Sequence, residues 1–340
     1  MKLFVNHSLN PYFNLAAEEY LIDHTSEDII LLWRNAPAVI IGKNQNAFAQ
    51  INLDFTRAHG IAVVRRLTGG GAVFHDPGNI NFTFISPPHG ALAEGIREGG
   101  LDFAHFAAPV IDALRGLGVE ASLSGRNDIM ADGRKISGNA QCVRNGVTMH
   151  HGTLLFSADV SAMQGALSVD PSKLRAKGID SVRSRVANLC ELLPAEHRMD
   201  APAFMAYLVH AMEARYGVTA EPFTAEMRAG IQTLADEKYA SDAWNLQRFG
   251  SFGVSRRKRF PFGSIELELT VHEGKIDTLA IGGDFFGMRD VSELTEVLCG
   301  TEYDRAAVTA RLADIPVDAY ISGCTAAELV CVLFDTDAIH

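Results

Sequence analysis

The sequence predicts a chain of two domains in which helices are combined with antiparallel β-strands. First, its 340 residues exceed what a single domain usually holds. Second, two turn signals, Asp132-Gly133 and Asn145-Gly146, divide residues 128–156 into three strand-like segments, as in an antiparallel meander. Third, the composition shifts near residues 237–245, where we expect a linker or boundary. The segment beyond it has its own strand pair and helices, enough for a small separate domain.

The first part of the chain predicts a helix and then several strands. Asn10 can cap the helix and Pro11 can occupy its first turn, and the apolar residues that follow fall on one helical face. Apolar residues at helical spacing predict a further helix over residues 103–117, which Gly118 can end. From the apolar runs and alternations between these helices, we expect strands over residues 29–33, 38–41, 61–67 and 80–84.

A glycine-rich stretch follows the third of these strands. Residues 65–76 read Arg-Arg-Leu-Thr-Gly-Gly-Gly-Ala-Val-Phe-His-Asp. Three consecutive glycines let the backbone approach a ligand and adopt positive φ, and converging amides beside two arginines are typical of an anion site. The spacing matches neither the P-loop nor the dinucleotide-binding pattern, so a phosphate would be held by a strand–loop–strand. The alternative is a flexible hairpin with solvated arginines.

The meander contains a lysine. A period of two places Lys135 and Ser137 on one face of their strand and Ile136 on the other. Spacing alone favours a solvated lysine at a sheet edge. The neighbouring Ser-Gly-Asn and His-His-Gly-Thr stretches are small and polar within a sheet, and they favour a functional site instead.

Two later segments are basic. Residues 167–185 contain five basic residues, with Gly178 as a pivot. They form either a solvated surface loop or a mobile cover that closes over an anionic intermediate. Residues 256–259, Arg-Arg-Lys-Arg, are most simply a solvated loop, with a surface for an acidic carrier protein as the alternative. In this half of the chain we expect helices over residues 202–216, 291–299 and 305–312, and strands over 265–271 and 276–281.

Composition predicts an ordinary globular enzyme of a reducing compartment. The net charge is −11, and a broadly acidic chain is a poor non-specific binder of nucleic acid or membrane. The five cysteines form no Cys-x-x-Cys pair, which excludes the usual zinc signatures and a disulfide framework. The chain has no apolar signal segment and no run long enough for a membrane span. We expect a cytoplasmic monomer.

An ordered set of motifs runs through the first part of the chain. After the glycine-rich stretch come Gly-Arg-Asn-Asp-Ile at 125–129, Arg-Lys-Ile-Ser-Gly-Asn-Ala at 134–140, His-His-Gly-Thr-Leu-Leu at 150–155 and Lys-Gly-Ile-Asp-Ser-Val-Arg-Ser-Arg-Val-Ala-Asn-Leu at 177–189. Together with residues 11–19 and 32–36, these motifs resemble the lipoate–protein ligase A family. The resemblance is dense through residue 193 and looser beyond. Leu67-Thr68 and Asn139 stand where small residues such as serine are expected.

The resemblance implies an α+β fold and a two-step reaction. Residues 1–242 would form a biotin/lipoate ligase-like catalytic domain with mixed, largely antiparallel sheets, and residues 243–340 a small α+β accessory domain. Lipoate and ATP, with Mg²⁺, would give lipoyl-adenylate and pyrophosphate. The lipoyl group would then pass to a lysine of a lipoyl carrier domain, in a 2-oxoacid dehydrogenase E2 subunit or the glycine cleavage H protein. Such chemistry needs positioning and charge neutralisation.

The same resemblance implies roles for individual residues. Lys135 matches the lysine that contacts both the lipoyl carbonyl and the adenylate phosphate, where a compact cation suits two acceptors. ATP and adenylate binding would fall to Arg66, Gly71, Ala72, Val73, Phe74 and Asn79. The lipoate site would include His151, Gly152 and Thr153, with the apolar tail in a tunnel beside their strand. The adenylate-binding loop would include Lys173, Lys177, Gly178, Val182 and Arg183.

Two kinds of side chain keep alternatives open. Asp128 is a candidate carboxylate facing Mg²⁺, and a strand-end salt bridge is the alternative. The histidines at 75, 150 and 151 are expected to line the site or to be structural, because their spacing fits no zinc site.

Two other functions compete with the ligase. An octanoyltransferase would take its acyl group from a carrier-protein thioester through Cys142, although a mid-strand cysteine is better interpreted as a buried, inert thiol. A non-catalytic binder of lipoate or carrier domains is the second alternative. The presence of Lys135, Arg66 and the glycine-rich stretch argues against it.

Overall fold

The computed structural model describes residues 1–94, 101–167, 185–246 and 253–334. Its main element is an eight-stranded sheet in the order β11-β1-β2-β6-β10-β9-β8-β7. β1, β2 and β11 run parallel, and the other neighbours pair antiparallel. The strands are β1 (Lys2–Asn6), β2 (Ile29–Arg34), β6 (Asn79–Ser86), β7 (Ala121–Ser124), β8 (Asp128–Ala131), β9 (Arg134–Arg144), β10 (Val147–Leu155) and β11 (Ala220–Glu221). The α+β class with mixed, largely antiparallel sheets is confirmed.

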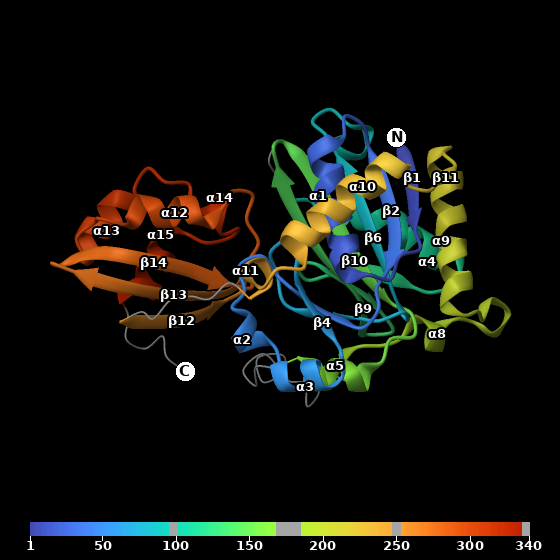
Figure 1. Cartoon of the computed structure of the whole chain (residues 1–340), viewed down its shortest axis with the longest axis horizontal. Coiled ribbons are helices and arrows are strands. Elements are labelled where there is room, and N and C mark those ends of the chain that lie inside the picture. Colours follow the sequence, from blue (N-terminus) through green and yellow to red (C-terminus); the bar gives the residue numbers. More distant parts are fainter. Residues whose placement is uncertain (95–100, 168–184, 247–252, 335–340) are drawn as a thin grey trace.

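Helices cover both faces of this sheet (Figure 1). On one face, α4 (Phe103–Gly116) and α9 (Ala201–Tyr216) bury their apolar residues against β1, β2 and β6. On the other face lie α1 (Pro11–His24), α10 (Ala225–Leu234) and the π-helical turn η3 (Ala235–Tyr239). Asn10 caps α1 as predicted, because its side chain accepts hydrogen bonds from two amides of the first turn.

A second, three-stranded sheet carries the glycine-rich stretch. Its order is β4-β3-β5, with β3 parallel to β4 and antiparallel to β5. β2 and β3 are close in sequence and lie in different sheets, so the short turn between them carries the chain from one layer to the other. Short helices α3 and α5 pack on this sheet. The bounds are β3 (Ala38–Ile41), α2 (Ala47–Gln50), α3 (Leu53–Ala58), β4 (Ala62–Arg65), β5 (Val73–His75) and α5 (Val160–Ala166).

The predicted meander forms β8, β9 and β10. Both predicted turns have positive φ at their two central residues: 49° and 69° at Asp132-Gly133, and 52° and 80° at Asn145-Gly146. This geometry matches the right-handed twist of the flanking strands. The structure therefore confirms the turn chemistry that the sequence indicated.

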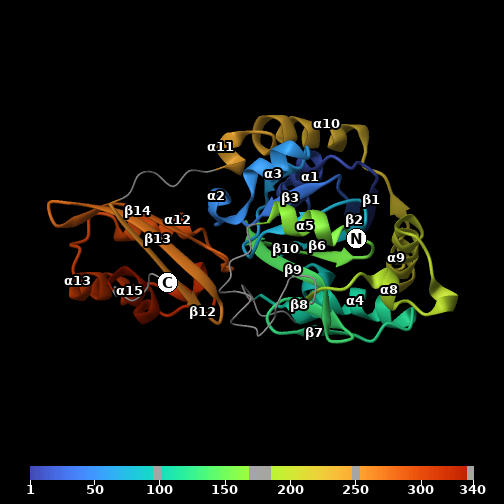
Figure 2. The ribbon, with the colours of Figure 1, turned by 90° about the horizontal axis from the view of Figure 1, so that it is seen from below.

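The C-terminal part forms a separate small layer pair (Figures 1 and 2). Strands β12-β13-β14 make an antiparallel sheet, and helices pack on it around one hydrophobic cluster. The predicted strand pair and the helices near 291 and 305 are all present. The bounds are β12 (Val254–Phe260), β13 (Gly263–His272), β14 (Lys275–Gly283), α12 (Val291–Leu298), α13 (Arg305–Leu312), α14 (Val317–Tyr320) and α15 (Ala326–Phe334). Residues 1–246 also contain η1 (Ala91–Ala93), α8 (Leu189–Leu192), η2 (Ala195–His197) and α11 (Asp242–Asn245).

Two expectations for this half are corrected. The basic residues 256–259 lie in strand β12, where Arg257 pairs with Glu266 of β13, so they do not form a loop. Residues 237–245 are no linker, because Tyr239 and Asn245 are buried against the large body. Among the described residues, no helix combines the length and apolar character that crossing a membrane requires.

Candidate functional site

A cavity of about 330 Å³ lies between the large sheet and the sheet of the glycine-rich stretch. Strands β2, β6, β9 and β10 form one wall, and β3, β5 and the glycine-rich stretch form the other. Most of the predicted site residues line it, namely Arg66, Gly71, Ala72, Val73, Phe74, Asp128, Lys135, His151, Gly152 and Thr153. Residues from four separate parts of the sequence therefore meet at one place.

The large sheet supplies its wall as a row of residues in register. Trp33 of β2 pairs with Asn81 of β6, which pairs with Thr153 of β10. The Thr153 hydroxyl accepts a hydrogen bond from the amide of Gly138 on β9, and Gly138 pairs with Asp128 of β8. The cavity therefore extends along the sheet, perpendicular to its strands. The aromatic Trp33 lies at one end and the charged Asp128 at the other.

Lys135 stands at the charged end of this row. Its Nζ atom lies 2.7 Å from Oδ1 of Asp128, and Nη2 of Arg185 lies 3.2 Å from Oδ2 of the same carboxylate. A bulge in β9 at Ile136, next to Lys135, shifts the strand register at this point. A Cβ on Gly138 would come within 2.9 Å of the lysine Nζ, so glycine leaves room for the ammonium group. The interpretation of Lys135 as a solvated edge lysine is therefore wrong.

Arg66 holds the glycine-rich stretch in shape. Its Nη2 donates to the carbonyls of Gly69 and Gly71 at 2.6 and 2.9 Å, its Nη1 to the carbonyl of Ile40, and its Nε to the hydroxyl of Thr68. Burial lowers the pKa of this guanidinium to about 10, so it remains charged at neutral pH. Arg66 lines the cavity, and most of its N–H groups donate to the glycine-rich stretch. These hydrogen bonds hold the backbone of that stretch in position beside the cavity.

A buried relay connects Arg66 with a carboxylate on helix α1. Oγ1 of Thr68 lies 2.8 Å from Nε2 of His151, and Nδ1 of His151 lies 2.8 Å from Oε1 of Glu18. Because the Glu18 carboxylate only accepts, Nδ1–H of His151 donates to it, and Nε2 of the neutral ring then accepts from the Thr68 hydroxyl, whose oxygen also accepts from Arg66. Glu18 is 1% exposed and supplies the negative charge that a buried arginine needs.

Arg65 has a purely structural role, which corrects the expectation that both arginines serve an anion. Its side chain is 1% exposed and is absent from the cavity wall. It donates to the carbonyls of Gly42, Lys43, Gln45, Trp244 and Asn245. These hydrogen bonds tie residues 244–245 to residues 42–45, which follow β3.

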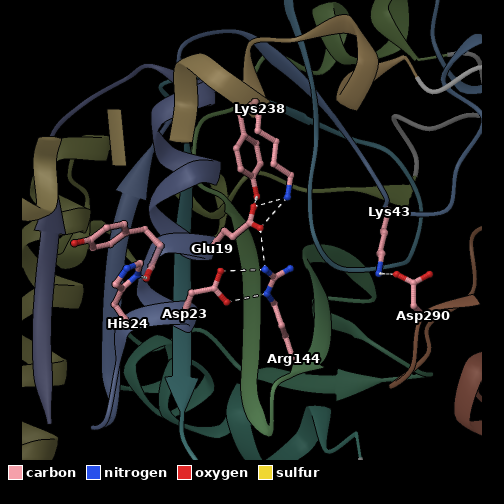
Figure 3. A network of polar contacts seen from close by, with 9 residues as sticks. Glu19, Asp23, His24, Lys43, Arg144, Lys238 and Asp290 are labelled. Carbon is pink, nitrogen blue, oxygen red and sulfur yellow. Dashed lines mark hydrogen bonds and ion pairs between the residues drawn. The ribbon is translucent and has the colours of Figure 1, made fainter. Parts of the chain in front are cut away.

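A second ionic network lies behind the site, around Glu19 (Figure 3). Lys238 Nζ lies 2.8 and 2.7 Å from the two carboxylate oxygens, Tyr239 donates its hydroxyl at 2.8 Å, and Arg144 approaches at 3.3 Å. Arg144 also binds both oxygens of Asp23. The consecutive glutamates of α1 thus serve two networks: Glu18 faces the site, and Glu19 anchors η3.

The C-terminal part reaches the cavity with the segment after β14. Phe286 lines the cavity and packs with Phe103 and Ala140. Arg126 stacks over the Phe286 ring at 4.4 Å and donates to the carbonyls of Phe262 and Asp284. Lys43 forms an ion pair with Asp290 at 2.7 Å, and the amide of Gly70 donates to the carbonyl of Phe285. The glycine-rich stretch is therefore held from both parts of the chain.

Several polar atoms near the cavity have no hydrogen-bond partner among the described residues. They are Nε2 of His75, Nδ2 of Asn81 and Oδ1 of Asn79. His75 and Asn81 line the cavity. Asn79, predicted to contact the nucleotide, does not line the cavity; it is buried two residues before Asn81 on β6 and donates from Nδ2 to Oδ1 of Asn81. Buried polar atoms without partners mark places where a ligand or water completes the site.

The charged end does not form a metal site by itself. Within residues 1–94, 101–167, 185–246 and 253–334, no three His, Cys, Asp or Glu side chains cluster closely enough to hold a metal ion. Both oxygens of Asp128 face cations, as the salt-bridge alternative predicted. Lys173, Lys177, Gly178, Val182 and Arg183 lie outside the described residues.

Neither Cys142 nor His150 lines the cavity. Cys142 is buried against α1, and burial raises the pKa of its thiol to about 12. His150 faces the opposite side of β10, where it stacks on Phe106. Glu18 had no predicted role although its motif was recognised; the signal was a pair of consecutive glutamates in an apolar helix. Trp33 and Arg126 lie in the recognised motifs at 32–36 and 125–129 but had no predicted role, and Phe286 lies outside every motif.

Comparison with known proteins agrees with this geometry. Residues 10–213 match the family described as Lipoyl protein ligase A/B catalytic domain, and residues 251–333 match the Bacterial lipoate protein ligase C-terminus. The chain is 41% identical to Lipoate-protein ligase LplJ of Bacillus subtilis over 98% of this chain and 100% of the relative. It is 36% identical to Lipoate--protein ligase 1 of Staphylococcus aureus, covering 97% and 99%.

Solved structures share the fold. P. falciparum LipL1, solved in complex with lipoate, superposes with a TM-score of 0.76 at 24% identity, covering 92% of this chain and 94% of that one. A lipoate-protein ligase A bound with ATP gives 0.60 at 26% identity, covering 72% and 98%. A bi-partite lipoate protein ligase from Thermoplasma acidophilum, studied with its E2 lipoyl domain, gives 0.61 at 26% identity, covering 74% and 98%.

Proposed function

The chain belongs to the lipoate–protein ligase family, and on that premise we propose that it activates lipoate with ATP and transfers the lipoyl group to a lysine of a lipoyl carrier domain. The protein is a ligase. The observation that carries the proposal is the single cavity that joins the Lys135 ammonium, the glycine-rich stretch and an apolar end at Trp33. The glycine-rich stretch suits a nucleotide, the Lys135 ammonium suits a carboxylate, and the apolar end at Trp33 suits an acyl tail.

In the first step the lipoate carboxylate attacks the α-phosphate of ATP, and pyrophosphate leaves. Lys135 is proposed to bind both the carboxylate and the phosphate, since an ammonium group has three rotatable donors and one of them faces Asp128. Charge on the phosphoryl oxygens grows in the transition state, and a fixed cation stabilises it. Asp128 and Arg185 hold the lysine in position for this.

The nucleotide is proposed to bind along the glycine-rich stretch. Gly71, Ala72, Val73 and Phe74 line the cavity and offer their backbone groups, while Arg66 holds their shape. A Cβ on Gly71 would meet nothing within 4 Å, so this position borders open space that a phosphate or ribose can fill. Asn79 does not line the cavity, so it is proposed to support the nucleotide site through its hydrogen bond to Asn81.

The acyl tail is proposed to cross the large sheet beside His151, Gly152 and Thr153. Gly152 is required here, because a Cβ would come within 2.3 Å of both Asn139 and Phe82. In the second step the amine of the carrier lysine attacks the acyl carbonyl, AMP leaves, and the amine loses a proton to give the amide. Exclusion of water protects the mixed anhydride between the steps.

Mg²⁺ is proposed to enter with ATP as part of the substrate, because Mg²⁺ is usually held by phosphates and one or two carboxylates. We assign residues 1–242 to catalysis and 243–340 to an accessory domain, with Trp244 and Asn245 at the start of the latter bound to Arg65 of the catalytic part. The carrier is proposed to be a lipoyl domain of a 2-oxoacid dehydrogenase E2 subunit or the glycine cleavage H protein. Support for a lipoyl domain comes from the Thermoplasma acidophilum ligase, which was studied with such a partner.

Intact-mass spectrometry of an apo lipoyl domain tests the proposal. One reaction contains the protein, lipoate and Mg-ATP; a second lacks ATP and contains an octanoyl carrier-protein thioester. We expect the mass of a lipoyl group to appear in the first reaction alone. Modification from the thioester alone would replace the ligase with an acyltransferase. Lipoate binding with no modification in either reaction would replace it with a binding protein.

A further inference from the structure

His75 stands at the apolar end of the cavity, where the ligase chemistry gives it no role. It lines the cavity on β5 and is 4% exposed. Its ring meets that of Trp33 edge-on, with 5.9 Å between the centroids. Leu15, Ile40 and Val73 also line the cavity. An apolar acyl tail suits these neighbours, but a histidine among them needs an explanation.

Neighbouring hydrogen bonds determine which ring nitrogen carries the proton. The amide nitrogen of Asn14 donates to the carbonyls of Ser8 and Arg34, which fixes the orientation of that side chain. The two N–H groups of this nitrogen are shared among three acceptors, the third being Oδ1 of Asn35 at 2.8 Å, and Nδ2 of Asn35 therefore points to Nδ1 of His75 at 3.1 Å. Nδ1 of His75 is thus the acceptor, and the proton sits on Nε2.

The Nε2–H group of His75 is a buried donor without a partner among the described residues. Burial, reinforced by His151 and Arg66, lowers the pKa of His75 to about 3, so the ring is neutral at physiological pH. Nδ2 of Asn81, which pairs with Trp33 across the sheet, is likewise without a partner. A buried donor left without an acceptor is unfavourable, so a ligand that supplies an acceptor here binds better.

The position of His75 matches the far end of a lipoyl chain. The row from Trp33 through Asn81 and Thr153 to Gly138 spans three strand spacings, about 14 Å at the usual spacing. The Lys135 ammonium lies against Gly138, at the opposite end from His75. An extended eight-carbon acyl chain with its carboxylate on Lys135 ends beside Trp33 and His75. In lipoate, that end carries a dithiolane ring.

Resting on the proposed function, we infer that His75 donates its Nε2–H to a sulfur of the dithiolane ring, and that this bond makes the ligase select a sulfur-containing acyl chain over an all-carbon one. Sulfur is a weak acceptor, and it also makes favourable contacts with aromatic rings such as that of Trp33. An all-carbon chain of the same shape leaves the donor without a partner. A site built to donate a hydrogen bond discriminates against an analogue that lacks the acceptor.

Two substitutions separate the donor from the packing of the ring. In His75→Asn the amide oxygen takes the place of Nδ1 and still accepts from Asn35, but no donor remains near Nε2. In His75→Gln the amide nitrogen takes the place of Nε2 and keeps that donor. The substrates are lipoate and its carbocyclic analogue, in which both sulfurs are CH₂ groups. Calorimetry measures the binding of each to the full-length protein, and a carrier-domain assay measures kcat/KM.

We expect the wild-type protein to favour lipoate over the carbocyclic analogue. His75→Asn should lower that preference about tenfold, because binding and kcat/KM fall for lipoate and stay unchanged for the analogue. His75→Gln should retain most of the preference. Equal losses for both substrates, or a His75→Gln protein that behaves like His75→Asn, would overturn the inference. So would a wild-type protein that does not distinguish the two. If the ligase proposal is wrong, the wild-type protein will modify no carrier with either substrate. Calorimetry will still measure whether the protein binds lipoate more tightly than the carbocyclic analogue.

Discussion

Nδ1 of His151 lies 2.8 Å from Oε1 of Glu18, although 133 positions separate the two residues in the sequence. This bond joins helix α1 to the strand that crosses the cavity. Through Thr68 it continues to Arg66, which shapes the glycine-rich stretch. Glu18 also accepts from Thr83, which in turn accepts from the indole of Trp33. Trp33 on one wall of the cavity and Arg66 on the other are therefore connected to one buried carboxylate.

Substitution Glu18→Gln should destabilise the fold, because it removes the negative charge opposite buried Arg66. We expect the free energy of unfolding to fall by about 2 kcal/mol, measured by urea denaturation. Glu27→Gln is the control, since that carboxylate is 41% exposed in its ion pair and should cost less than about 0.5 kcal/mol. Equal effects of the two substitutions would contradict the assignment of Glu18 as counter-charge.

Substitution Lys135→Ala should abolish adenylate formation and leave the fold intact. The lysine side chain is partly exposed, and its loss leaves Asp128 paired with Arg185. Pyrophosphate release in the presence of lipoate and ATP should drop by about a hundredfold or more. Lys275→Ala, at an exposed lysine of the C-terminal part, should release pyrophosphate at the wild-type rate. Retained adenylation in Lys135→Ala would remove this residue from catalysis.

Substitution Gly71→Ala should impair nucleotide binding without affecting stability. Its Cβ would meet no atom of the protein within 4 Å and would project into the space assigned to the nucleotide. We expect the urea midpoint to stay unchanged and KM for ATP to rise several-fold. Gly152→Ala serves as the contrast, because its Cβ would collide with Phe82 and Asn139 and should destabilise by about 1–3 kcal/mol. Wild-type KM in Gly71→Ala would place the nucleotide elsewhere.

Cys142 should be inert. Burial raises the pKa of its thiol to about 12, so almost no thiolate exists at neutral pH. Iodoacetamide should label the exposed Cys299 and leave Cys142 unmodified, as read by peptide mass spectrometry. Cys142→Ala should ligate lipoate within about twofold of the wild-type rate. Loss of carrier modification in a folded Cys142→Ala protein would revive the acyltransferase alternative.

Stability should depend on His75 in mildly acidic solution. Its pKa is lowered from 6.5 to about 3, chiefly by burial, so the unfolded chain takes up the proton first as the pH falls. The contribution of His75 to the free energy of unfolding is complete above the pKa that His75 has in the unfolded chain. It is lost progressively as the pH falls toward the pKa of His75 in the folded protein, by up to about 1.4 kcal/mol per pH unit. Urea denaturation between about pH 7 and about pH 4.5 should show a shallower loss for His75→Asn. An identical pH slope would contradict a neutral, buried His75.

Much of the fold could be read from local patterns. The turn residues at 132–133 and 145–146, the Asn10 cap and the alternating strand of residues 265–271 each act through neighbouring atoms, so the sequence alone was sufficient. Strand β12 was missed because four basic residues suggested solvent, whereas Glu266 on the next strand pairs with Arg257. The segment 237–245 was misjudged because Arg65 and Glu19, which hold it, are distant in sequence.

For the site, the sequence by itself determined the residue types and the family, because motifs for adenylate chemistry retain the same order along the chain. It identified Lys135, the glycine-rich stretch and the His-His-Gly-Thr strand. Only the tertiary structure decided what each side chain binds. Arg65 and Arg66 are adjacent in sequence, yet one fastens residues 244–245 to the turn after β3 and the other shapes the cavity. Glu18, Trp33 and His75 meet there because sheet register and layer packing join distant segments, and no local pattern encodes those contacts.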